Sequence, residues 1–224
     1  MKKEASLYWA VYKNLEKDVI DLSYQIHFDD KQLKTYSIKI ADLIFRCSTE
    51  LEAIAKDIYR EIAKEEPENS GNCFLFLEKC WKISKKVVII SAVNFHFNEK
   101  FVPHFAPFDY KKDSENDYFK AYCSIKHDRV KNLEKANINI LIRVMAALYL
   151  LNIYYRDETH KFEFEDTSMG SDIFSIKKYS PYGIFQKLVD FPLDKDGYMY
   201  VEGEMKPTNT PFILHNWIEN YKKL

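Results

Sequence analysis

The stretch INILIRVMAALYLLNIYY, residues 138–155, decides the fold of this chain. Nearly every side chain in it is apolar, so a helix formed here has no polar face to turn toward water. A helix of that kind lies at the centre of a bundle or crosses a membrane. Asn139, Arg143 and Asn152 interrupt the run, and an arginine at mid-span is costly in lipid. We therefore expect a buried helix and no membrane segment.

The apolar spacing continues upstream of this stretch. Val130, Leu133 and Asn137 fall on the same line as Leu141 and Leu148, so the pattern predicts one long central helix over residues 128–155. A shorter helix is predicted over residues 114–126, immediately before it. The central helix then begins at a row of four ionisable residues.

A second strong helical pattern covers residues 36–64. Apolar residues recur there at the three-and-four spacing of an amphipathic helix, and the polar face carries Arg46 and Glu50 as an opposite-charge i,i+4 pair. Turn-forming residues 66–72 end it, and a helix over residues 73–85 follows. Near the N-terminus the pattern favours a short helix over residues 5–15, continued as helix or as an extended arm.

Alternation replaces helical spacing in two other regions. Residues 87–97 read as an extended segment, followed by a loop that Phe101, Phe105 and Phe108 would fix onto the helices. Past residue 156, short alternating runs flank Gly170 and predict a β-hairpin. Another strand-like piece covers residues 196–203, and an amphipathic segment closes the chain.

The predicted fold is therefore mainly α: an antiparallel helical bundle with a small β element in the C-terminal third. We expect residues 1–155 to form the bundle. Residues 156–224 would be a hairpin-containing extension packed on it, within the same domain. The 224 residues suit one such domain.

Composition narrows the functional classes. The chain has 33 Lys and Arg against 34 Asp and Glu, without the basic excess typical of a dedicated duplex-DNA binder. Five glycines and no phosphate-loop motif argue against a nucleotide-binding loop. The four cysteines form no C-x-x-C pair, and we expect free thiols, no metal site, no cofactor and a cytoplasmic location.

The row Lys126-His127-Asp128-Arg129 is the best candidate site in the sequence. A histidine can act as general base near neutral pH, and Lys126 and Arg129 could hold a phosphate. Asp128 could orient the histidine or cap the following helix. The alternative is a purely structural cluster whose charges pair with one another and with Glu134, and from spacing alone that alternative is the more common outcome.

Two segments together resemble the HEPN superfamily: FRCSTELEAIAKDIYREI, residues 45–62, and YCSIKHDRVKNLEKANINILIRVMAALYLLNIYY, residues 122–155. More narrowly, the chain is similar to uncharacterised bacterial HEPN-like proteins that carry a Tyr-Asn-x-x-Lys-His-Asp-Arg type sequence. The resemblance covers about residues 36–155. It implies a compact helical bundle, commonly a symmetric dimer.

The resemblance also implies a function directed at RNA. Many members are metal-independent ribonucleases of defence and toxin–antitoxin systems, and others bind RNA or nucleotides without cleaving them. The nuclease motif places an Arg four to six residues before the His. At those positions this chain has Cys123, Tyr122 and Ala121, and the nearest upstream cation is Lys120, seven residues before His127.

The candidate set is thus His127, Arg129 and Lys126 as catalytic residues. Asp128, Tyr122, Glu50 and Arg46 would support them. The expected partners are a second copy of the chain, RNA, and a protein partner or antitoxin. The alternative reading is a non-enzymatic dimeric interaction protein in which the Lys126–Arg129 row is structural.

Overall fold

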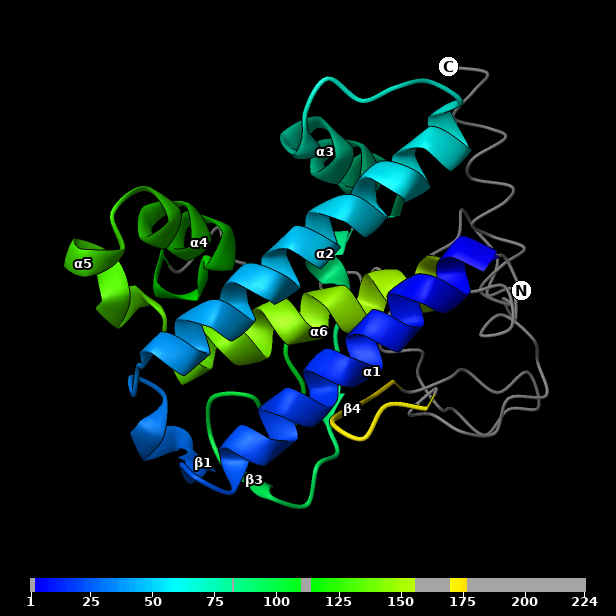
Figure 1. The fold of residues 1–224 in the computed structure, drawn as a ribbon. Coiled ribbons are helices and arrows are strands. Elements are labelled where there is room, and N and C mark those ends of the chain that lie inside the picture. The colour runs from blue at the N-terminus through cyan, green and yellow to red at the C-terminus, as the bar shows by residue number, and fades with distance from the viewer. Residues whose placement is uncertain (1–2, 82, 110–113, 156–169, 177–224) are drawn as a thin grey trace, which may run out of the picture.

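The structure is a computed structural model, and it describes residues 3–81, 83–109, 114–155 and 170–176. The described residues form six α-helices and four two-residue strands (Figure 1). The helices are α1 (Lys3–Ser23), α2 (Ile38–Ala63), α3 (Ser70–Trp81), α4 (Tyr118–His127), α5 (Arg129–Asn132) and α6 (Ile138–Tyr155). The predicted mainly α fold, a helical bundle with a small β element, is confirmed.

Helices α2 and α6 begin at the same end of the bundle. Tyr36 and Asn137, which precede them, form an isolated antiparallel β-bridge. The backbone N–H of Ile138 donates to the carbonyl of Thr35 at 3.1 Å, and that of Asn139 donates to the carbonyl of Leu33 at 3.1 Å. The two helices then run across the molecule in the same direction (Figure 1).

Helix α1 runs in the opposite direction to α2 and α6. Near its start, Tyr8 donates a hydrogen bond to Asp57 of α2 at 2.6 Å and packs edge-on against Tyr155 of α6. Near its end, Asp18 pairs with Arg46 at 2.5 Å, close to the start of α2. These contacts fix the antiparallel arrangement of α1.

Every residue of α6 is buried, as the apolar stretch predicts. Ile138–Tyr155 is the one helix among the described residues that is long and apolar enough to cross a membrane, and here it forms the core of the bundle. Its buried Arg143 lies 5.5 Å from the ring centres of both Phe101 and Phe105. The aromatic loop is therefore fixed onto the core, as expected from the sequence.

The β structure consists of two small sheets. β2 (Ile89–Ile90) pairs antiparallel with β4 (Phe174–Ser175), and β1 (Phe28–Asp29) pairs parallel with β3 (Phe95–His96). The extended segment predicted over residues 87–97 therefore supplies one strand to each sheet. Gly170 adopts the positive φ of 87° that a glycine turn requires. The hairpin arm that precedes it lies outside the described residues, as do the predicted elements beyond residue 176.

A buried carboxylate attaches the segment 170–176 to α1. Oε1 of Glu16 accepts hydrogen bonds from the hydroxyls of Tyr12 and Ser171 and from the backbone N–H groups of Asp172 and Ile173. Its other oxygen pairs with Lys13 at 2.5 Å. A buried charge needs such partners, and they hold the last described segment against the first helix.

One prediction for the helices is wrong. Residues 128–155 do not form one helix, because the chain breaks at Asp128, with φ −150° and ψ 86°, and again at Ala136, with φ −84° and ψ 71°. The side chain of Asp128 caps α5 and that of Asn137 accepts from the N–H of Ile140 at 3.2 Å, capping α6. Each cap starts a new helix, and Val130, placed on the apolar stripe by its spacing, is 94% exposed.

The other boundaries shift by less. The N-terminal helix is longer than expected and runs to Ser23, while the segment 36–64 starts at Ile38 behind a Ser37 cap. The third helix begins three residues early and ends at Trp81, before a 3₁₀ turn at Ile83–Lys85. All four cysteines are free, as predicted.

Candidate functional site

The Lys126–Arg129 row joins the end of α4 to the start of α5. Lys126 and His127 complete α4, Asp128 lies at the break, and Arg129 opens the four-residue helix α5. The row therefore does not begin the central helix, which starts at Ile138. The prediction that these four residues open the central helix is wrong, because the two caps at Asp128 and Asn137 separate them from it.

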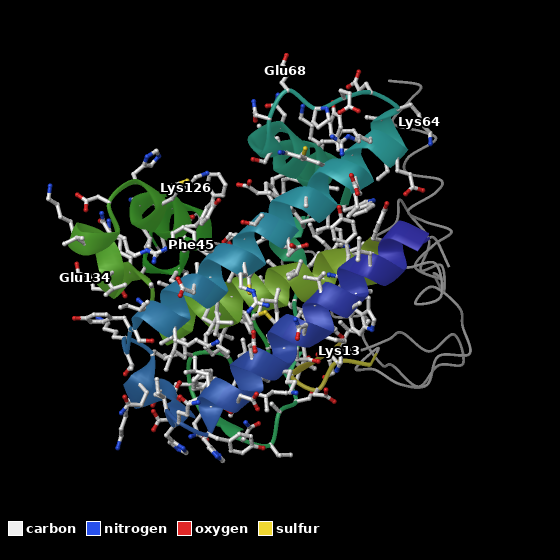
Figure 2. All side chains as sticks on the ribbon, viewed as in Figure 1. Lys13, Phe45, Lys64, Glu68, Lys126 and Glu134 are labelled. Carbon is white, nitrogen blue, oxygen red and sulfur yellow. The ribbon has the colours of Figure 1, made fainter. Side chains whose placement is uncertain are left out.

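Lys126 turns back along its own helix. Its Nζ lies 3.5 Å from the hydroxyl of Tyr122 and 5.4 Å from the centre of that ring. Tyr122 is buried and packs edge-on against Phe45 of α2. In Figure 2, Phe45 of α2 is labelled on the side of that helix that faces α4, the helix that carries Lys126. Tyr122 thus serves the α2–α4 contact and supports the lysine.

Asp128 is occupied by local structure. Its carboxylate accepts the N–H of Lys131 at 3.2 Å and pairs with the Nζ of the same residue at 3.3 Å. Its carbonyl accepts from the side chain of Asn132 at 2.8 Å. Of the two roles expected for Asp128, the geometry supports the helix cap.

Arg129 reaches across to α2. Its guanidinium lies 3.4 Å from a carboxylate oxygen of Asp42 and 4.9 Å from the centre of the Phe45 ring. Both charged side chains are about half exposed, at 48% and 53%, so the pair contributes little stability. The guanidinium stays accessible to a second anion.

His127 differs from its three neighbours. The residue is exposed, and no hydrogen bond or ion pair joins its imidazole to any residue that the structure describes. The row is therefore not a convergent catalytic cluster within one chain. It is three anchored side chains around one unengaged imidazole.

Arg46 and Glu50 lie on a different face of α2 from the row. Arg46 pairs with Asp18 of α1, rather than with Glu50 as the i,i+4 spacing suggests. Partial burial raises the pKa of Glu50, and Arg46 opposes that shift. The structure brings Tyr122, Lys126 and Arg129 together around Phe45 but leaves Arg46 and Glu50 on the α1 side.

A cleft of about 770 Å³ opens where α2 and α6 begin, and no residue of the row lines it. Its lining comes from the segment before α2, from Lys100, from α4 and from the residues leading into α6. We call it the lysine cleft, because it is lined by Lys31, Lys34, Lys100, Lys120 and Lys135. Sequence reasoning missed this cleft, since the five lysines are scattered over more than a hundred residues.

The described residues contain no group of three or more His, Cys, Asp or Glu side chains that could hold a metal ion. Burial raises the pKa of the half-buried Cys123 thiol, the cysteine nearest the row. That shift disfavours the thiolate needed for nucleophilic chemistry.

No protein-family model, curated protein or solved structure matches the chain. A functional conclusion therefore rests on the residues of the α4–α5 junction and on the resemblance that they carry.

Proposed function

We propose that this protein binds RNA through the α4–α5 junction. One observation carries the proposal: His127 is exposed and unengaged in a segment that also presents four cations. Those cations are Lys126, Arg129, Lys131 and Lys135. Phosphate contacts supply most of the affinity of a nucleic-acid binder, and a local cluster can do so although the whole chain carries a formal charge of −1.

The HEPN resemblance supports the same reading. It adds the expectation of a conditional, metal-independent ribonuclease in a defence or toxin context. Such a cleavage needs a base that removes the proton of the 2′-hydroxyl, an acid that protonates the leaving 5′-oxygen, and cations around the phosphorane. His127 suits the role of base, with Arg129 and Lys126 as the cations.

The acid is the missing component within one chain, because no second titratable group contacts His127 among the described residues. A two-fold dimer whose axis passes beside the α4–α5 junction would bring a second His127 to the same interface. We therefore propose that a single chain binds RNA. We propose cleavage only for a dimer in which the α4–α5 junctions of two chains lie together.

The test uses purified wild-type protein and His127→Ala. Binding to a labelled single-stranded RNA is measured by fluorescence anisotropy at several salt concentrations, and both proteins are then mixed with cellular RNA in EDTA and resolved on a denaturing gel. We expect salt-sensitive binding, and circular dichroism of the variant identical to wild type because His127 is exposed. Absence of binding at low salt would overturn the proposal.

The gel decides the catalytic part separately. Cleavage by wild type and not by His127→Ala places the reaction at His127. RNA that stays intact with both proteins leaves a binding protein. Cleavage that persists in His127→Ala contradicts the assignment of the base.

A second candidate function, a dimeric interaction protein, is favoured by apolar exposure next to the row. Val130 is 94% exposed, and Ile38, one turn before Asp42 on α2, is 62% exposed. Contiguous apolar patches on a surface mark protein interfaces, and a dimer would cover these two side chains. Val130→Glu should then dissociate a dimer in analytical ultracentrifugation without changing the urea midpoint of the monomer. A wild-type protein that sediments as a monomer at high concentration would exclude this reading.

A further inference from the structure

The lysine cleft has the size and position of a ligand site. Its volume of about 770 Å³ lies within the range of pockets that hold small ligands, about 300–1,000 Å³. Its floor is formed where α2 and α6 begin, by Asn137, Asn139 and Ile140. Both amides are already hydrogen-bonded within the protein, Asn137 to Ile140 and Asn139 to Asn116. These hydrogen bonds hold the two amide side chains in place, so the groups left to contact a ligand are mainly the lysine side chains of the walls.

The lysines of the walls are available to a ligand. Lys31, Lys34 and Lys120 are exposed, and none pairs with an acidic side chain among the described residues. Lys135 donates to the hydroxyl of Ser124 at 3.2 Å, which holds its ammonium group on the α4 side. These four lysines come from three separate segments that line one space.

Four acidic residues line the cleft beside its five lysines: Asp30, Glu115, Asp117 and Glu134. Asp30 accepts three backbone N–H groups, those of Asn98, Glu99 and Lys100. Asp117 accepts the N–H of Lys120 at 2.9 Å and caps α4. Both carboxylates are therefore engaged by backbone donors. The exposed carboxylate of Glu134 stands at the rim without a partner among the described side chains.

Tyr36 adds an aromatic surface to the cleft. Its side chain is 51% exposed although its backbone is held by the bridge to Asn137. An anchored, exposed ring beside cationic side chains is the arrangement by which proteins stack the bases of single-stranded nucleic acids while contacting the phosphates. Duplex RNA does not present its base faces in this way.

The cleft also connects to the row along one face of α4. Lys120, Ser124 and His127 follow the i, i+4, i+7 spacing of a single helix face. Seven residues of α-helix span about 10 Å. A strand bound at Lys120 and followed along this face arrives at the unengaged imidazole of His127.

We propose that the lysine cleft binds the sugar-phosphate backbone of single-stranded RNA, stacks one base on Tyr36, and leads the strand along α4 to His127. This inference rests on the proposed function and specifies its substrate as single-stranded. It also assigns a second contact region that the sequence pattern did not indicate.

The first test removes two charges from different segments of the cleft lining with Lys34→Ala/Lys120→Ala. Its matched control, Lys17→Ala/Lys79→Ala, removes two exposed lysines from α1 and α3, away from the cleft lining. Anisotropy with a labelled 12-nucleotide oligo(U) should show roughly three- to thirtyfold weaker binding for the cleft variant only. Its salt slope, log K against log salt, should fall by about 0.7 per lost phosphate contact.

The second test separates a stacked base from a bare polyanion. Tyr36→Ala should weaken oligo(U) binding at least fivefold, because stacking contributes about 1–3 kcal/mol per base. It should leave binding of inorganic polyphosphate unchanged. Tyr24→Ala, which removes a tyrosine that is 77% exposed and does not line the cleft, is the control. A duplex of the same length should bind more weakly than oligo(U).

The outcomes distinguish the two proposals. Wild-type protein that binds no RNA overturns both. Wild-type binding that Lys34→Ala/Lys120→Ala leaves unchanged, while Lys126→Ala/Lys131→Ala weakens it, retains the junction and overturns the cleft. Equal loss in the cleft variant and its lysine control also overturns the cleft, since the effect would then follow net charge alone.

Discussion

Glu16 is fully buried, and its side chain is contacted by five donors, two of them backbone N–H groups of the segment that leads into β4. Replacing it with Ala would leave the N–H of Asp172 without its acceptor, and Tyr12 and Ile173 with only the hydroxyl of Ser171 as a partner. We expect Glu16→Ala to lower the free energy of unfolding by about 3–5 kcal/mol, measured by urea denaturation. Glu16→Gln, which keeps one acceptor oxygen, should cost less. Equal stability of Glu16→Ala and wild type would contradict the buried network.

Asp30 makes the stability of the β1–β3 end depend on pH. Partial burial raises the pKa of Asp30. The three N–H donors of the 98–100 loop lower it by more than burial raises it, so the net shift of the pKa is downward. A carboxyl with a lowered folded-state pKa stabilises the protein above its unfolded value, about 3.9, and this contribution is lost as pH falls through the folded value.

Asp30→Asn should therefore be less stable than wild type at pH 6. The difference between the two proteins should begin to shrink below about pH 4, where the carboxyl of the unfolded wild-type chain takes up a proton, and should disappear once the pH falls below the lowered folded-state pKa. Urea midpoints at pH 6 and pH 3 measure it. A difference that stays constant over this range would show that the carboxylate charge plays no part.

At the scale of single residues, the sequence indicated chemistry but not partners. His127, the predicted catalytic base, is the one member of its row without a hydrogen bond or ion pair in the described structure, and its role stays a prediction. Arg46 was assigned to Glu50 by spacing, yet it pairs with Asp18, because packing of α1 against α2 offers a nearer carboxylate. Spacing reports neighbours on one helix and says nothing about the helix opposite.

At the scale of elements, side-chain caps decided the boundaries. Ser37 accepts the N–H of Ile40 at 3.1 Å and starts α2 beside the bridge to Asn137. Ser37→Ala should cost about 1 kcal/mol in urea denaturation, because that N–H loses its acceptor. Ser37→Asp should retain most of the stability. The salt-sensitive RNA binding of Ser37→Ala should match wild type, since Ser37 does not line the lysine cleft.

Caps also explain why one predicted helix became two. The apolar period ran without interruption through residues 128–155, and period alone does not reveal a break. Asp128 and Asn137 were visible in the sequence as helix-starting residues, but such residues are also tolerated inside helices. At Asn137 the backbone is extended rather than helical, because it forms a β-bridge with Tyr36 just before the start of α2. That contact makes Asn137 a helix-starting residue rather than a residue inside a helix.

At the scale of the molecule, the segment 170–176 belongs to the same core as the helices. Phe174 is fully buried and packs against Tyr149 of α6. We expect Phe174→Ala to lower the free energy of unfolding by about 3–5 kcal/mol in a single cooperative transition. Val93→Ala, at a position 93% exposed, should stay within about 0.5 kcal/mol of wild type. A separate early transition in wild type would instead mark the segment as an independent unit.

The bundle was predictable because its central helix, α6, is apolar on every face. Such a helix has to be covered by other elements on all sides unless it lies in a membrane. The lysine cleft was not predictable, because its walls come from residues within 30–36, 115–121 and 134–140 and from residue 100. These segments meet only once α2 and α6 start together. A site made by the junction of distant segments has no local spacing to detect.

The complete burial of α6 has a consequence for the chain as it is being made. Helices α1 and α2 leave the ribosome before α6, but β4, which covers α6 at Phe174 and is held by Glu16, follows about twenty residues after α6 ends. At translation rates of 5–20 residues per second, that delay lasts about 1–4 s. During this interval the nascent chain presents an uncovered strip of its most apolar helix, which is the kind of surface that holdase chaperones bind.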